Sequence, residues 1–148
     1  MPERVMLRPR TMYLMNQANQ AVRTQLEQEL RGLGLTGIQY TVLSIVDARE
    51  GISSAQLSRR FFVTPQTMNE IVSALERRGL LLRRESLESK RILSATLTDA
   101  GRDALGRCDA VADRVEGKFM SLLSDEDFAA LRAILPRFLK AIREDGER

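Results

Sequence analysis

A row of short polar side chains in the middle of the sequence could recognise another molecule by hydrogen bonding. Across residues 64–79, apolar residues recur at i, i+3, i+4 and i+7, which predicts a helix with one buried face. At 100° per residue, the opposite face carries a polar row with two flanking residues: Gln66, Glu70, Ser73 and Arg77, beside Thr67 and Asn69. Such donors and acceptors suit the reading of base edges in the DNA major groove. An ordinary two-helix corner with a polar outer face would show the same pattern.

The residues before this helix predict how it is positioned. Thr64 is a good N-cap, and Pro65 sits at the first helical position, where its missing N–H is not needed. Pro65 also disfavours helical backbone at Thr64, so a preceding helix must end near Val63. Ser53 and Gln56 form a capping box that begins this preceding helix, and Thr36 with Gln39 forms another that begins the helix before it. The sequence therefore predicts two short helices joined by a tight turn.

A basic hairpin is predicted to follow the helix pair. Residues 81–84 and 92–97 alternate apolar and polar side chains as strands do, and the polar tip between them ends in Lys90 and Arg91. Together with the helix, this wing gives the expected DNA contacts: Thr64, Gln66, Thr67, Asn69, Glu70, Ser73, Arg77, Arg84, Lys90 and Arg91.

The positive charge of the chain is concentrated on this module. Residues 59–91 hold eight basic and four acidic side chains, a balance of +4, whereas the whole chain carries only +3, so the remainder is −1. Contact with phosphates needs positive charge at this place. A hairpin that is merely solvated would not explain the concentration.

Long amphipathic helices are expected on both sides of the module. Residues 4–33 and 99–145 carry apolar stripes at helical spacing, and residues 36–101 form the reading region. The stripe of the helix after the wing is expected to continue to Leu122, and Ser124 is expected to cap the last helix. We therefore expect one domain over residues 1–148, mainly α with a small β wing: a winged helix-turn-helix flanked by long dimerisation helices. The stripes exceed what this small region can cover, which favours a homodimer. A dimer of this kind would bind a pseudo-palindromic operator in double-stranded DNA.

Composition argues against an enzyme. The 148 residues include no His and one Cys, and we find no nucleophile–base pair, metal-ligand cluster or glycine-rich phosphate loop, so neither cofactor nor metal is expected. No apolar run approaches the roughly 18 residues of a membrane span, and the first residues lack a signal-peptide core. With a single Cys, which fits a reducing compartment, this predicts a cytoplasmic protein without membrane partners.

The motifs of the wing resemble those of the MarR (multiple antibiotic resistance regulator) family. The matching residues are Leu75-Glu-Arg-Arg-Gly-Leu80, Arg83-Arg84, Lys90-Arg91 and Leu97-Thr-Asp-Ala-Gly101. The resemblance implies a homodimeric transcription regulator, often a repressor released by phenolic or lipophilic ligands or by oxidants. Two positions depart from the family pattern: Ser89, where an acid usually steadies the wing arginine, and Glu70, where many members have a basic residue.

The sequence leaves open how the protein is regulated and whether its partner is DNA. Met12, Met15 and Tyr40 are weak candidates for contacts with a small-molecule effector, although a packed tyrosine with a hydrated hydroxyl is commoner. Cys108 could make the protein an oxidant sensor, but it lies on an apolar stripe, which favours a buried thiol. A winged-helix module that binds protein instead of DNA is the remaining alternative, and salt dependence of duplex binding would distinguish it.

Overall fold

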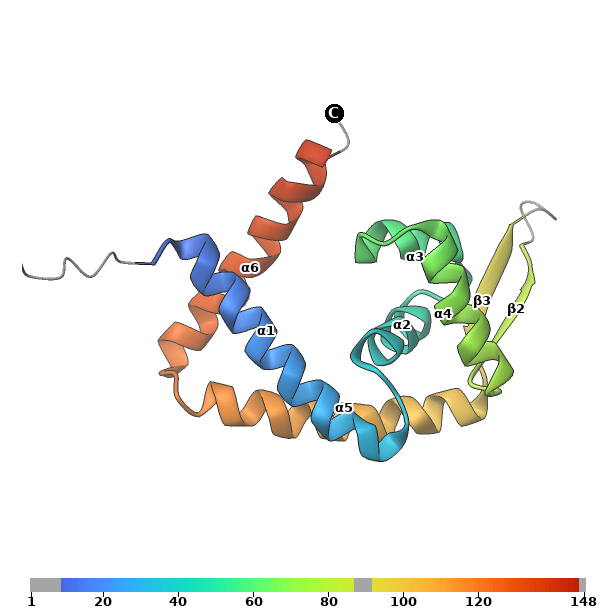
Figure 1. Ribbon diagram of the computed structural model, residues 1–148, viewed down its shortest axis with the longest axis horizontal. Coiled ribbons are helices and arrows are strands. Elements are labelled where there is room, and N and C mark those ends of the chain that lie inside the picture. The colour runs from blue at the N-terminus through green and yellow to red at the C-terminus, as the bar shows by residue number, and fades with distance from the viewer. Residues whose placement is uncertain (1–8, 87–91, 147–148) are drawn as a thin grey trace, which may run out of the picture. The chain divides into compact units, whose positions relative to one another are not determined.

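The computed structural model describes residues 9–86 and 92–146, which form a mainly helical protein with a small sheet (Figure 1). The helices are α1 (Thr11–Leu30), α2 (Gly37–Ala48), α3 (Ser54–Phe61), α4 (Pro65–Arg77), α5 (Asp99–Met120) and α6 (Asp125–Gly146), with one 3-10 turn, η1 (Arg31–Leu33). The strands are β1 (Ile52–Ser53), β2 (Leu81–Glu85) and β3 (Leu93–Leu97). This architecture confirms the predicted fold class. By internal packing, the chain divides into two compact units, Met1–Ala112 and Asp113–Arg148.

The capping residues predicted from the sequence begin the helices of the first unit. Reciprocal capping boxes begin α2, where Thr36 is the N-cap, and α3, where Ser53 is the N-cap. Thr64 caps α4 and Pro65 occupies its first turn. The long N-terminal helix is shorter at its end than predicted, because α1 stops at Leu30 and the chain passes through η1. Gly34 then takes the left-handed conformation at φ 68°, which glycine adopts without steric cost.

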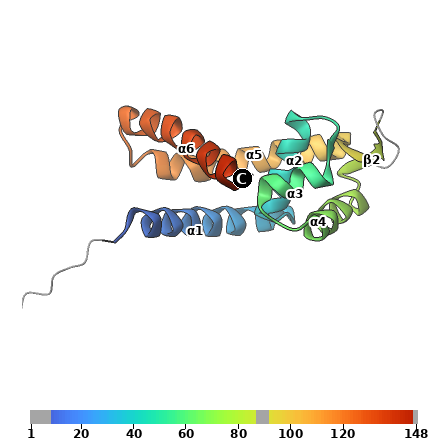
Figure 2. The same cartoon turned by 90° about the horizontal axis from the view of Figure 1, so that it is seen from above.

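The three strands form one antiparallel sheet in the order β1-β3-β2. Residue Ala95 of β3 pairs with Ile52 on one side and with Arg83 on the other. The hairpin of β2 and β3 stands beside α4 (Figure 1), and α2, α3 and α4 gather next to it (Figure 2). The predicted wing strands are thus present, with bounds shifted by one residue at Glu85 and at Leu93.

The core of the first unit lies between these helices and the inner face of the sheet. Its fully buried members include Val42 of α2, Leu57 of α3, Leu75 of α4 and Leu81 of β2. Gly101 lets the start of α5 pack directly on the turn after α4, since a Cβ there would collide with the carbonyl oxygen of Leu80. That close approach gives a physical reason for the glycine in the motif at residues 97–101.

The second unit holds the end of α5 and all of α6. Ser124 caps α6 by accepting a hydrogen bond from the N–H of Asp127 at 3.1 Å, as the sequence predicted. Leu122 was expected to continue the apolar stripe of α5, but α5 ends at Met120 and Leu122 is 82% exposed. Among the helices of the described residues, none has the length and apolar character to cross a membrane.

Candidate nucleic-acid interface

Helix α4 is held by one apolar face, as its periodicity predicted. Met68, Val72 and Leu75 are all 0% exposed, and Ile71 is half-buried. The preceding turn is tight because Phe62 takes the left-handed conformation at φ 54°. This packing fixes which side chains α4 presents outward.

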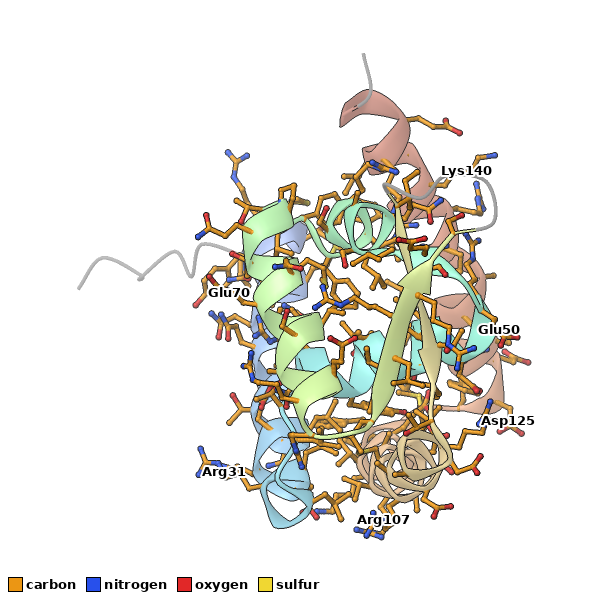
Figure 3. All side chains as sticks on the ribbon, turned by 90° about the vertical axis from the view of Figure 1, so that its right-hand side faces the viewer. Arg31, Glu50, Glu70, Arg107, Asp125 and Lys140 are labelled. Atoms are coloured by element: carbon orange, nitrogen blue, oxygen red, sulfur yellow. The ribbon has the colours of Figure 1, made fainter. Side chains whose placement is uncertain are left out.

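The outward side of α4 carries three long polar or charged groups. Gln66, Glu70 and Arg77 are exposed, and Glu70 projects from the side of α4 that faces away from the strands (Figure 3). Thr64 and Thr67 lie at the start of the helix, where the Thr64 hydroxyl accepts from the Thr67 N–H at 3.1 Å and donates to the Thr67 hydroxyl at 2.9 Å. The two threonines therefore shape the N-terminus of the helix.

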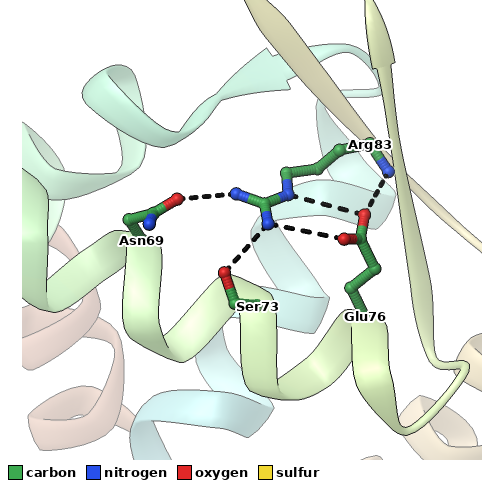
Figure 4. Close-up of polar contacts among 4 residues, drawn as sticks. All are labelled: Asn69, Ser73, Glu76 and Arg83. Carbon is green, nitrogen blue, oxygen red and sulfur yellow. Dashed lines mark hydrogen bonds and ion pairs between the residues drawn. The ribbon is translucent and has the colours of Figure 1, made fainter.

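A second polar stripe of α4 faces the wing and is bound by Arg83 of β2 (Figure 4). The Arg83 guanidinium donates to Oδ1 of Asn69 at 2.6 Å and to Oγ of Ser73 at 2.9 Å. It also donates to both carboxylate oxygens of Glu76, at 3.4 and 3.5 Å, and the Arg83 backbone N–H donates to Glu76 at 3.0 Å. We call Asn69, Ser73, Glu76 and Arg83 the helix–wing cluster.

The cluster is partly withdrawn from water and electrostatically coupled. The Arg83 side chain is only 14% exposed. Its hydrogen bonds hold the pKa of the Glu76 carboxyl below the ordinary value, and they outweigh the opposing effect of burial. Arg84, the next residue along β2, is exposed because successive strand side chains point to opposite faces. The two adjacent arginines thus have different environments.

The structure corrects the predicted polar row. Ser73 was expected to point outward with Gln66, Glu70 and Arg77, but it is half-buried and bonded to Arg83 together with Asn69. Ser73 is three or four residues from both Glu70 and Asn69, so it can belong to either stripe, and the contact with Arg83 places it with Asn69 and Glu76. Arg83 and Glu76 were absent from the predicted contacts: helical spacing puts Glu76 on the Asn69 stripe, but strand alternation does not say whether Arg83 or Arg84 faces α4.

Another arginine anchors the end of α4. Arg78 donates from Nη1 to the carbonyl oxygen of Gly34 at 2.6 Å, which links the end of α4 to the segment after η1. Arg77 and Arg84 remain as exposed cations of this surface among the predicted contacts. The predicted wing-tip contacts Lys90 and Arg91, and the departure at Ser89, lie outside the described residues.

The candidate effector residues lie on two helices and have different surroundings. Met12 is exposed and Met15 half-buried on α1, whereas Tyr40 of α2 donates its hydroxyl to Asp109 of α5 at 2.7 Å. Burial, reinforced by that hydrogen bond and the Asp109 charge, raises the pKa of Tyr40 to about 12. Two hollows of about 280 and 290 Å³ lie along α6 and along α1 with Arg31, and neither is lined by any of these three residues.

Cys108 lies in the core rather than at a reactive surface. It is 0% exposed, and burial raises the pKa of its thiol. Oxidant-sensing thiols are exposed and of low pKa. The buried position therefore favours a structural thiol.

Comparison with known proteins identifies relatives with this arrangement. The MarR family model matches residues 33–92, which include both short helices and β2. The HTH-type transcriptional repressor Rv2887 of Mycobacterium tuberculosis is 35% identical over 112 residues, covering 76% of this chain and 81% of the repressor. The crystal structure of Rv2887 with salicylic acid superposes with a TM-score of 0.72 at 30% identity, over 88% of this chain and 97% of that one.

More distant structures share the fold. The Staphylococcus aureus MepR–DNA complex gives a TM-score of 0.78 at 20% identity, covering 90% of this chain and 99% of MepR. The transcriptional regulator SlyA gives 0.83 at 22% identity, covering 94% and 98% of the two chains. These likenesses confirm the winged helix-turn-helix architecture.

Proposed function

The chain belongs to the MarR family of transcriptional regulators, and from this premise we propose that it is a homodimeric repressor that binds a pseudo-palindromic operator. The family comprises DNA-binding regulators rather than enzymes. For this chain we propose in addition which residues contact DNA, that two chains form a dimer, and that a small aromatic acid controls binding.

The observation that carries the proposal is the outward face of α4 beside the wing. Gln66 and Glu70 offer donors and acceptors at the helix surface, and Arg77 and Arg84 add exposed positive charge next to them. A helix of this kind reads base edges while the cations contact phosphates. Glu70 accepts hydrogen bonds only, so it favours the N4 amino group of cytosine over guanine.

Selection of bound duplexes from a random library tests the operator. A two-fold dimer presents its two reading helices to successive major grooves, so we expect inverted half-sites about 10 bp apart or a multiple of that spacing. The affinity should fall steeply as salt rises, because phosphate contacts release counterions. Asymmetric sites that saturate at one chain per duplex, or a module that binds no duplex at low salt, would contradict the proposal.

The dimer is proposed from apolar residues that one chain leaves exposed. They lie on α1 and α6, the helices predicted to mediate dimerisation: Met12, Tyr13, Leu14, Val22, Leu131, Ile134, Leu135, Leu139 and Ile142. Exposed apolar surface of this extent marks an interface, and an obligate dimer buries on the order of 2,000 Å² or more. On this proposal, residues 1–148 work as one functional domain in the cytoplasm, where the operator is accessible.

Control by a small aromatic acid is proposed from the relative. Rv2887 forms complexes with salicylic acid and with p-aminosalicylic acid. We expect salicylate to weaken operator binding by this protein, as measured by titration of a labelled duplex at fixed ionic strength. Benzyl alcohol, which lacks the carboxylate, is the matched control for a non-specific effect of an aromatic ring.

A further inference from the structure

The helix–wing cluster engages the hydrogen-bond acceptors of the α4 stripe that lies nearest the wing. Arg83 donates to Oδ1 of Asn69 and to Oγ of Ser73 with charged donors, which form stronger hydrogen bonds than neutral ones and so orient both side chains toward the wing. The Asn69 amide nitrogen then lies on the side away from Arg83 (Figure 4). Asn69 is itself exposed, so this nitrogen is available to another molecule.

We infer that Arg83 determines which bases α4 can read, because it turns the oxygen of Asn69 toward the wing and leaves the amide N–H groups on the outward side. The inference rests on the proposed function and deepens it. It makes Arg83 a positioning residue, which acts on the operator through Asn69.

The consequence follows from the hydrogen-bond pattern of the major groove. An asparagine recognises adenine with both ends of its amide, accepting from N6 and donating to N7. Because its oxygen is directed at Arg83, 2.6 Å away, Asn69 cannot turn both ends of its amide toward one adenine. Its outward N–H groups match bases that present acceptors: guanine has two, at O6 and N7, whereas thymine has O4 and adenine only N7. Cytosine offers only a donor there and should be rejected.

The environment of Arg83 argues against a direct phosphate contact. Four of its five guanidinium N–H donors are used within the cluster, and the side chain is 14% exposed. Reaching a phosphate would separate Arg83 from Glu76 and leave that carboxylate without its partner. Arg84 has the same charge at the next position and is exposed, so it is the better phosphate contact and a matched control.

The test compares Arg83→Met with Arg84→Met on the operator recovered from the random library. Base preferences along the operator are first compared between the parent and Asn69→Ala. The base pair at which the variant loses its preference is the one that Asn69 reads. Four duplexes that differ only at that pair are then titrated. We expect the parent to prefer guanine or thymine, and Arg83→Met to raise the affinity for adenine relative to guanine roughly tenfold. Arg84→Met should leave this ratio unchanged while lowering the slope of log affinity against log salt.

A thermal melt shows whether Arg83→Met is folded, and a second variant is tested in case it is not. Arg83→Lys keeps the charge but lacks the planar fork, so it should shift the same ratio and leave the salt slope at the parental value. The inference is overturned if Asn69→Ala alters no base preference, if the parent prefers adenine at that pair, or if both Arg83 variants keep the parental ratio. Failure of the parent to select any specific duplex would instead reject the proposed function, and the inference with it.

Discussion

The α4–β2 junction and helix α6 use their side chains in opposite ways. At the junction, apolar residues of α4 are fully buried, and the half-buried Arg83 of β2 has a partner for four of its five guanidinium N–H groups. On α6, large apolar residues are 38–56% exposed, and the ion pair of Lys140 with Glu144, at 3.7 Å, lies in solvent and stabilises little. The first region is complete within one chain, whereas the second leaves an apolar face exposed, which the proposed dimer would cover.

The largest expected effect would come from placing a charge on the apolar face of α6. Leu135→Glu would bury a carboxylate in the proposed interface, so we expect association to weaken by about 4 kcal/mol, or roughly 1,000-fold. Sedimentation equilibrium from nanomolar to micromolar concentration measures the change. Ala133→Glu adds the same charge on another face of α6 and serves as the control. A parent protein that is a folded monomer at micromolar concentration would remove the basis of the comparison.

The next effect concerns the region that is complete in one chain. Leu75 is fully buried in α4, so Leu75→Ala should cost about 2–5 kcal/mol of unfolding free energy through lost contacts and a cavity. It should leave the dimer dissociation constant of the folded protein unchanged. Leu135→Ala should do the reverse and weaken association, because Leu135 contributes to the proposed interface. Urea unfolding and sedimentation of both variants separate the two effects, and equal responses would show that the regions are not distinct.

The sequence was sufficient to predict the winged region because its signals are local. Caps at Thr36, Ser53 and Thr64, the proline at position 65 and the apolar periodicity of α4 each act within a few residues. Each of these signals predicts where one helix begins, and the structure begins α2, α3 and α4 at those places. The MarR resemblance rested on the same stretch.

The helix–wing cluster was harder to predict because it depends on contact between two elements. Helical spacing alone could not show that Ser73 turns toward β2, since that depends on where the wing strand packs. Arg83 and Arg84 are adjacent and chemically identical, and only the pairing of Arg83 with Ala95 fixes which arginine faces α4. The error at Leu122 has a similar origin, because the end of α5 interrupts a repeat that continues in the sequence.

A smaller effect would sharpen the distinction between contacts that position the protein and contacts that read sequence. Arg91 lies outside the described residues, and its place at the tip of the wing stays a prediction. Arg91→Ala should weaken binding to all duplexes by about 1–3 kcal/mol and lower the salt slope, as loss of an arginine from a narrow minor groove would. Gln66→Ala should instead relax one base preference and leave the slope almost unchanged. Titration of a labelled duplex with both variants across a salt series separates the two roles. If Arg91→Ala binds like the parent at every salt concentration, the wing makes no DNA contact.

The smallest effect concerns the link between α2 and α5 in the first unit. The Tyr40 hydroxyl donates to Asp109, and ionisation of the phenol would place two negative charges together in a half-buried site. The pKa of Tyr40 is therefore raised to about 12, mainly by burial. Because the folded state holds this proton more tightly than the unfolded state, the contribution is fully present below pH 10 and is lost as the pH rises toward 12.

Tyr40→Phe should lower the unfolding free energy by about 1 kcal/mol at pH 7, the usual worth of one hydrogen bond. It should also reduce the further loss of stability between pH 10 and 12, because no phenol remains to ionise at position 40. Asp109→Asn keeps the accepting oxygen but removes the charge, so it should retain most of the stability at pH 7. Its alkaline loss should shift to a slightly lower pH, since burial remains while the repulsion is gone. Urea unfolding at pH 7, 9 and 11 measures all three proteins. If Tyr40→Phe matches the parent at each pH, the link contributes nothing, and apolar packing alone joins α2 to α5.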